Sequence, residues 1–243
     1  KLYQILSKSR LDEIFIFHSS LTLVLVSYLA NIKNIYAPGI KYQNFFLNKK
    51  NKLYESFFSK SIDAVEETKN LTKKILKVDN IEFIPLKYNT NIDDQLVGIC
   101  IACSGSEKQW GEENYIKLIN FLIENKYKKF LLLSGKDQSN LEKAIISNYS
   151  DQVKFINTSK KSIGEVIPDL KKCNFVIGND TGFSHLSVAY NKKTYVILGD
   201  CPPHTYSNLI TAIDKDEEIE RSINSIKTIK LEKVLKYLSK SLI

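Results

Sequence analysis

The residues best suited to chemistry lie in three short polar segments, each of which follows a run of apolar residues. One of them, Asn-Asp-Thr-Gly at 179–182, precedes a stretch of small and apolar residues that contains His185. If a helix begins there, its first N–H groups lack partners within the helix and carry the positive end of its dipole, so they can bind an anion. Thr181 adds a hydroxyl donor, and Gly182 lets a phosphate approach the backbone closely. In the alternative interpretation, Asp180 or Thr181 only caps the helix, and His185 packs.

The other two segments add a cation and an acid. Ser104 supplies a small donor, and Lys108 supplies a point charge for phosphate. Alternatively, this lysine is merely solvated, and Trp110, the single tryptophan, is interpreted as a packing residue. Asp137 follows Gly135 in the third segment, where an acid can accept hydrogen bonds from a ribose. The spacing of a P-loop is absent.

Other motifs favour structural interpretations. The C-x-x-C pattern of Cys100 and Cys103 lies inside an apolar run, which argues against a redox or metal role. Asp214 and Asp216 form a D-x-D pattern within an acidic run, so a solvated turn is the preferred interpretation. The histidines show no zinc spacing, and we expect no metal site. The three histidines are His18, His185 and His204.

Alternating apolar runs and amphipathic stretches must position these segments. This pattern predicts a parallel sheet covered on both faces, in a doubly wound α/β domain. Ligands of such sheets bind at the carboxyl ends of the strands, where the three polar segments and the segment 199–204 lie. The predicted strands cover 96–106, 128–136, 153–158, 174–180 and 193–200, and the predicted helices 111–126, 139–149, 162–173, 184–191, 218–226 and 230–243.

The first part of the chain predicts a second α/β domain. Strands are expected at 11–20 and 33–40, a helix at 19–30, helical structure over 44–77 and an extended segment at 81–88. The polar, turn-rich segment 89–95 is the best linker candidate. We therefore expect a partial N-terminal domain over 1–92 and a C-terminal domain over 93–243.

Composition narrows the class of protein. The 243 residues are 43% hydrophobic and 26% charged, with a net charge of +8. The scattered lysines are compatible with a phosphate-rich ligand or an anionic membrane surface, but no motif indicates nucleic acid. No apolar run could span a bilayer, no signal peptide is seen, and the four cysteines fit reduced thiols in the cytoplasm. Methionine is absent, even at position 1, so we expect the sequence to begin within a longer protein or to lack modified methionines.

Taken in order, the three segments resemble the lipopolysaccharide heptosyltransferases, glycosyltransferase family 9. The family shows a hydroxyl-rich loop with Lys-x-Trp, a glycine turn, an Asp-Thr-Gly-x-x-His motif and a strand ending in glycine before a proline. The matching residues here are Lys108, Gln109 and Trp110, Gly135, Asp180 to Gly182 with His185 and Ala189, and Gly199 with Pro202 or Pro203. Residues 5–40 are similar to the second half of the family's first domain. The opening strand and Gly-Asp turn of that domain are not found.

The resemblance implies a GT-B architecture with two Rossmann-like domains, the N-terminal one incomplete and on the acceptor side. It implies inverting, metal-independent transfer of a sugar, heptose first of all, to a lipopolysaccharide or lipooligosaccharide core. The donor would be a nucleotide-sugar, with an ADP-sugar expected, and no further cofactor is needed. Ser104, Lys108, Thr181, Gly182 and His185 would bind the diphosphate, Asp180 the sugar and Asp137 the nucleoside. The general base would belong to the Gly-Asp turn that is not found, so no catalytic residue is assigned.

Departures from the family pattern leave alternatives open. Asp200 and Cys201 stand where a Pro-Thr-like pair is common, and Tyr190 to Lys193 replace small residues, which puts the transferred sugar in doubt. The alternatives are a nucleotide-sugar-binding fragment or non-catalytic relative, and a nucleotide-sugar epimerase. As a transferase, the protein would be bacterial and cytoplasmic. It would use a lipid-linked oligosaccharide acceptor, contact the inner face of the inner membrane peripherally and bind no nucleic acid.

Overall fold

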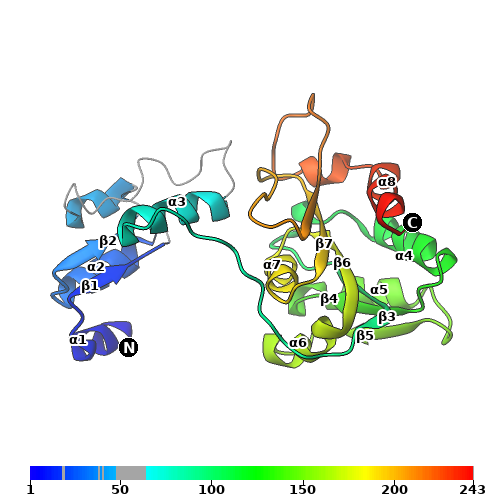
Figure 1. Cartoon of the computed structure of the whole chain (residues 1–243), viewed down its shortest axis with the longest axis horizontal. Coiled ribbons are helices and arrows are strands. Elements are labelled where there is room, and N and C mark those ends of the chain that lie inside the picture. Colours follow the sequence, from blue (N-terminus) through cyan, green and yellow to red (C-terminus); the bar gives the residue numbers. More distant parts are fainter. Residues whose placement is uncertain (18–19, 38, 40, 48–63, 243) are drawn as a thin grey trace. The chain divides into compact units, whose positions relative to one another are not determined.

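The computed structural model describes residues 1–17, 20–37, 39, 41–47 and 64–242 (Figure 1). The chain divides into two compact units, Lys1–Ile81 and Glu82–Ile243. Within the described ranges, none of the helices is both long and apolar enough to cross a bilayer.

The second unit is built on a six-stranded parallel sheet in the order β5-β4-β3-β6-β7-β8. This is the Rossmann strand order, which reverses direction between the neighbouring strands β3 and β6. The strands are β3 (Asp93–Cys100), β4 (Lys129–Leu133), β5 (Lys154–Asn157), β6 (Cys173–Asn179), β7 (Lys193–Leu198) and β8 (Ile210–Asp214).

The helices of this unit cover both faces of the sheet, because alternate strand residues point to opposite sides. Val97 and Ile99 pack in one core with residues of α4, α5 and α8, whereas Leu96 and Cys100 pack in the other with residues of α6 and α7 (Figure 1). This confirms the predicted doubly wound class. The helices are α4 (Glu112–Glu124), α5 (Ser139–Ile146), α6 (Ile163–Lys172), α7 (Gly182–Ala189) and α8 (Leu231–Leu242). Single 3-10 turns are η3 (Ser106–Lys108), η4 (Lys136–Gln138) and η5 (Ser225–Thr228).

The C-terminal part differs from the prediction in one helix and one strand. The helix predicted at 218–226 does not form, apart from the start of η5. Arg221 instead pairs with Asp214 at the end of β8, at 2.6 Å, and Ser225 accepts a hydrogen bond from the Ser222 N–H. Strand β8 was not predicted, because its five residues, Ile-Thr-Ala-Ile-Asp, form neither an uninterrupted apolar run nor a regular alternation of apolar and polar residues.

The first unit contains a two-stranded parallel sheet of β1 (Glu13–Phe15) and β2 (Asn34–Tyr36). Between them lies α2 (Leu21–Leu29), which Ser20 caps by accepting a hydrogen bond from the Leu23 N–H. These elements match the predicted strands and helix. The remaining elements are α1 (Leu2–Ser9), which was not predicted, η1 (Lys41–Phe46) and α3 (Ala64–Leu76). Much of the helical structure predicted over 44–77, and His18, lie outside the described residues.

The segment 82–92 belongs to the second unit. The boundary between the two compact units therefore lies before the domain boundary that the sequence predicted at 92/93. Leu86 donates its N–H to the carbonyl of Ala189, and the Tyr88 hydroxyl donates to the carbonyl of Tyr190. The predicted linker 89–95 ends inside β3. The functional roles expected of the two domains stay predictions.

Candidate donor-binding site

A pocket of about 680 Å³ opens at the carboxyl ends of β3, β4 and β6, where the strand order reverses. Five of the predicted site residues line it, and Lys108 and His185 are not among the lining residues. The lining residues are Ala102, Cys103, Ser104, Ser134, Gly135, Asp137, Gln138, Lys161, Ile163, Asp180, Thr181, Gly182, Phe183 and Leu186. The three polar segments therefore meet in one cavity. Open α/β sheets bind their ligands at this position.

The N-terminus of α7 forms one wall of the pocket. Thr181 is the N-cap, and its Oγ1 accepts a hydrogen bond from the Phe183 N–H at 3.2 Å, so the capping interpretation holds for this hydroxyl. The N–H groups of Ser184 and His185 donate to the carbonyl of Thr181, so the Gly182 N–H and the positive end of the dipole are what the first turn offers to an anion. A Cβ on Gly182 would meet no atom within 4 Å, so the backbone there is open to a ligand.

Asn179 holds the ends of β3 and β6 in place beneath this wall, a role the sequence did not reveal. Its side chain accepts a hydrogen bond from the Tyr115 hydroxyl at 2.6 Å and donates one to the carbonyl of Ala102 at 3.1 Å. Its own carbonyl accepts from the Ser184 hydroxyl. Asn179 is 1% exposed. The sequence signal for its structural role was a polar residue at the end of an otherwise apolar strand.

Close packing of β3 against β6 brings the two loops together. Gly178 has φ +143°, and a Cβ there would lie 2.1 Å from the carbonyl oxygen of Cys100. Only glycine fits this approach. The thiol of Cys100 then lies 3.0 Å from Thr181 Oγ1, and burial raises the pKa of Cys100 to about 11.

The β4 loop places Asp137 in the pocket through a tight turn. Gln138 accepts a hydrogen bond from the Gly135 N–H and donates one to the carbonyl of Cys103, so it joins this loop to that of β3. Behind the turn, the buried carboxylate of Glu142 accepts hydrogen bonds from the Ser134 and Ser159 hydroxyls.

Lys108 lies in η3 and turns toward the β7 loop. Its Nζ is 2.5 Å from Asp200 Oδ2, with about a third of each side chain exposed. The hydrogen bond to Asp200 raises the pKa of Lys108, so the ammonium is fully charged at neutral pH. A diphosphate in the pocket must therefore compete with Asp200 for this lysine.

Asp180 is the centre of a cluster of side chains from the β6 and β7 loops. Its Oδ1 lies 2.9 Å from His204 Nε2 and 3.4 Å from His185 Nε2, and its Oδ2 accepts from the Cys201 thiol at 3.0 Å. Burial opposes ionisation of Asp180, but hydrogen bonds from His185 and His204 outweigh it, so the pKa of this carboxyl lies well below its usual range. Both carboxylate oxygens are thus engaged within the protein.

The motifs that the sequence analysis interpreted as structural contact other parts of the protein. Trp110 is buried and donates from Nε1 to the carbonyl of Ile229 at 2.7 Å. Asp214 pairs with Arg221, and Asp216 pairs with Lys233 at 2.7 Å. All four cysteines are free thiols.

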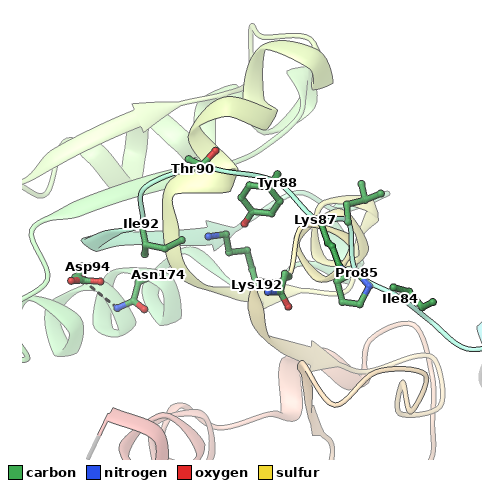
Figure 2. Close-up of a pocket in the computed structure, with 11 residues that line it drawn as sticks. Ile84, Pro85, Lys87, Tyr88, Thr90, Ile92, Asp94, Asn174 and Lys192 are labelled. Atoms are coloured by element: carbon green, nitrogen blue, oxygen red, sulfur yellow. Dashed lines mark hydrogen bonds between the residues drawn. The ribbon is translucent and has the colours of Figure 1, made fainter.

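A second pocket, of about 770 Å³, lies near the amino ends of the strands. Figure 2 shows Lys192 beside the ring of Tyr88, with Asn174 donating to the carbonyl of Asp94. Its lining residues are Ile84, Pro85, Leu86, Lys87, Tyr88, Thr90, Ile92, Asp94, Asn174, Asn191 and Lys192. None of the predicted site residues is among them, and this end of a doubly wound sheet is not where its ligands usually bind.

The strand order, with a pocket at the point where it reverses, defines a Rossmann-type α/β domain. The chain belongs to glycosyltransferase family 9 (heptosyltransferase), whose family model matches residues 47–236. This confirms the resemblance seen in the sequence.

Curated relatives match shorter stretches. Lipooligosaccharide heptosyltransferase 2 of Haemophilus influenzae is 27% identical over 111 residues, which are 44% of this chain and 32% of that protein. Lipopolysaccharide heptosyltransferase 2 of Escherichia coli K12 is 20% identical over 120 residues, which are 48% of this chain and 34% of that protein. These alignments span about a third of the relatives' length.

Solved structures share the fold over nearly the whole chain. The E. coli ADP-heptose lipopolysaccharide heptosyltransferase II has a TM-score of 0.67 at 17% identity, covering 99% of this chain and 79% of that one. E. coli heptosyltransferase WaaC, solved with ADP, has a TM-score of 0.70 at 17% identity, covering 98% and 75%. A family 9 glycosyltransferase of Veillonella parvula has a TM-score of 0.72 at 16% identity, covering 98% and 76%. The predicted GT-B-like fold class is confirmed.

Proposed function

We propose that this chain binds a nucleoside diphosphate sugar in the pocket at the carboxyl edge, with ADP-heptose as the donor. The observation that carries the proposal is the convergence of Ser104, Asp137, Thr181 and Gly182 on one pocket that includes the N-terminus of α7. Its support is the membership of family 9 and the similarity to a heptosyltransferase solved with ADP.

In the proposed complex, the diphosphate lies against the N-terminus of α7. The Gly182 N–H and the Ser104 hydroxyl donate to its oxygens, and Asp137 accepts from the ribose. Lys108 swings from Asp200 to the diphosphate, and His185 lies beside it. Asp180, which lines the pocket, is assigned to the sugar of the donor.

The proposed reaction is inverting transfer to a hydroxyl of a lipopolysaccharide or lipooligosaccharide core. The acceptor oxygen forms a bond to the anomeric carbon from the face opposite the diphosphate, and the bond from that carbon to the diphosphate oxygen breaks. The acceptor proton passes to a general base, which we assign to none of the pocket residues. Negative charge grows on the diphosphate, where Lys108 and the helix N-terminus stabilise it without a metal ion on the diphosphate.

We place this reaction in the cytoplasm, on a lipid-linked acceptor at the inner face of the inner membrane. The net charge of +8 is compatible with this placement, because basic residues are attracted to anionic headgroups.

Calorimetric titration with ADP, ADP-heptose, UDP and UDP-glucose tests the donor. We expect ADP and ADP-heptose to bind, and Lys108→Ala to weaken binding about tenfold, the magnitude of one charge-assisted hydrogen bond. Lys143→Ala, which removes an exposed charge of α5 outside the pocket, is the matched control and should bind as the wild type does. Absence of binding by every nucleotide, or equal affinity of the Lys108 and Lys143 variants, would contradict the proposal.

A further inference from the structure

The cluster around Asp180 contains the donor types of a transition-metal site. A carboxylate oxygen of Asp180, the sulfur of Cys201 and a ring nitrogen of His204 all lie within 4.8 Å of one another. They come from two loops that follow neighbouring strands, β6 and β7. Cys201 and His204 have C-x-x-H spacing, while Asp180 lies 21 residues before Cys201. The linear spacing of the histidines therefore did not reveal the group.

We propose that Asp180, Cys201 and His204 bind a zinc-class divalent metal ion. A set of one sulfur, one nitrogen and one oxygen suits Zn²⁺, whereas Mg²⁺ and Ca²⁺ require oxygen ligands. Tetrahedral zinc with its usual bond lengths separates such ligand atoms by about 3.4–3.6 Å. The contacts from Asp180 to His204 and Cys201, at 2.9 and 3.0 Å, need to open by about half an ångström to admit the ion.

His185 is placed to supply a fourth ligand. Its Nε2 lies 3.4 Å from Asp180 Oδ1, and its ring centroid lies 4.8 Å from that of His204. Its Nδ1 is 2.7 Å from the hydroxyl of Tyr206. If Nδ1 carries the proton and donates to this hydroxyl, Nε2 presents its lone pair to the metal, as in zinc sites whose histidines are oriented by a hydrogen bond on the far nitrogen.

Metal binding releases one proton from the protein. The metal takes the thiolate of Cys201, whose proton is released to solvent, together with the Asp180 carboxylate and a neutral imidazole. The side chain of His204 is 6% exposed and that of Asp180 22%, so a bound ion would be largely shielded from water. The ion would join the 200–204 loop to the start of α7. Since Asp180 lines the donor pocket, the ion would lie at the edge of that pocket, beside the residues assigned to the donor.

Cobalt substitution provides a direct test. The full chain, freed of any histidine tag and stripped of metal, is titrated with Co²⁺ and its absorption spectrum is recorded. We expect equimolar Co²⁺ to produce a sulfur-to-cobalt charge-transfer band in the near ultraviolet, together with visible bands of a four-coordinate ion. Zn²⁺ should displace Co²⁺ and abolish both.

Variants assign the ligands. Cys201→Ser should remove the charge-transfer band, and His204→Gln, whose side chain can still donate to Asp180, should weaken Co²⁺ binding at least tenfold. Cys103→Ser, a half-buried thiol of the neighbouring loop, should keep the band. Zn²⁺ should raise the melting temperature of the wild type but not of either ligand variant. Circular dichroism establishes that each variant is folded.

A folded wild type that gives no charge-transfer band overturns the proposal, because the cluster is then a hydrogen-bond network alone. A band that survives Cys201→Ser, or that Cys103→Ser removes, overturns it as well. All of these readouts report metal binding and are independent of nucleotide binding and sugar transfer.

Discussion

Lys108 and Asp200 form an ion pair with 2.5 Å between Nζ and Oδ2, and this pair occupies the lysine proposed to bind the diphosphate. The two residues come from loops that follow different strands, β3 and β7. The ion pair holds Lys108 near the pocket but also sets a competitor against the ligand. Asp200 is therefore expected to lower the affinity for a nucleoside diphosphate.

Asp200→Asn should bind ADP about two- to fivefold more tightly than the wild type. The amide keeps a contact to Lys108 but removes the negative charge that competes with the diphosphate, and partly exposed ion pairs are worth up to about 1 kcal/mol. Calorimetry at low and at high salt measures the effect, which salt should reduce. Glu113→Gln, which breaks the exposed pair with Lys117 on α4, is the matched control. Weaker binding by Asp200→Asn would show that Asp200 positions the lysine or contacts the donor.

Asn179→Ala should lower the free energy of unfolding by about 2–4 kcal/mol. The change leaves the buried hydroxyl of Tyr115 and the carbonyl of Ala102 without this partner, and each unsatisfied buried group costs about 1–3 kcal/mol. Urea unfolding followed by circular dichroism measures the loss.

A double-mutant cycle with Tyr115→Phe provides the control for Asn179. The double variant should be less destabilised than the sum of the two single changes, because phenylalanine leaves no hydroxyl to satisfy. Strict additivity would mean that the 2.6 Å contact contributes nothing to stability.

Gly178→Ala should destabilise the second unit by more than about 3 kcal/mol. Its Cβ would lie 2.1 Å from the backbone of β3, and φ of +143° is unfavourable for any other residue. Gly164→Ala in α6 is the matched control. A Cβ there meets nothing within 4 Å, so the helix should gain about 0.5–1 kcal/mol. Thermal unfolding compares the two, and equal melting temperatures would contradict the close approach of β3 and β6.

Bound ADP should protect the Cys103 thiol from alkylation, because this residue lines the pocket. Burial raises the pKa of Cys103 above the ordinary value of about 8.5, and the thiolate is the reactive form. Labelling should therefore be slower than that of free cysteine at pH 7–8, and should still rise with pH where free cysteine has levelled off.

Peptide mapping by mass spectrometry after iodoacetamide treatment measures the rate at each cysteine. Cys173, for which burial raises the pKa to about 12, should stay unlabelled in the folded protein and serves as the internal control. Labelling of Cys103 that is indifferent to ADP would place the nucleotide elsewhere.

The sequence predicted the second unit well because its central strands are apolar throughout and its helices carry regular apolar stripes. Strand β8 failed this criterion, since Thr211 and Asp214 interrupt its apolar residues. The apolar spacing at 218–226 suggested a helix, where Arg221 pairs with Asp214 instead. The predicted site residues came together because each follows a strand of the same sheet, which a topological rule anticipates.

Contacts between loops could not be predicted in the same way. The engagement of Lys108 by Asp200, and the position of Cys201 and His204 on Asp180, depend on how the β7 loop folds back over the β6 loop. Asn179 likewise acquires its role only from the packing of α4 against the sheet.

Calorimetric titration of Gly182→Leu with ADP tests the central claim, that the diphosphate binds at the N-terminus of α7, most directly. A side chain at this position enters open space in the pocket wall, so it should block the ligand without disturbing the fold. Gly164→Leu, also with open space around its Cβ and not among the residues lining the pocket, is the matched control. We predict that Gly182→Leu loses ADP binding at least tenfold at an unchanged melting temperature, while Gly164→Leu binds as the wild type does. Wild-type affinity in the Gly182→Leu variant would contradict the account.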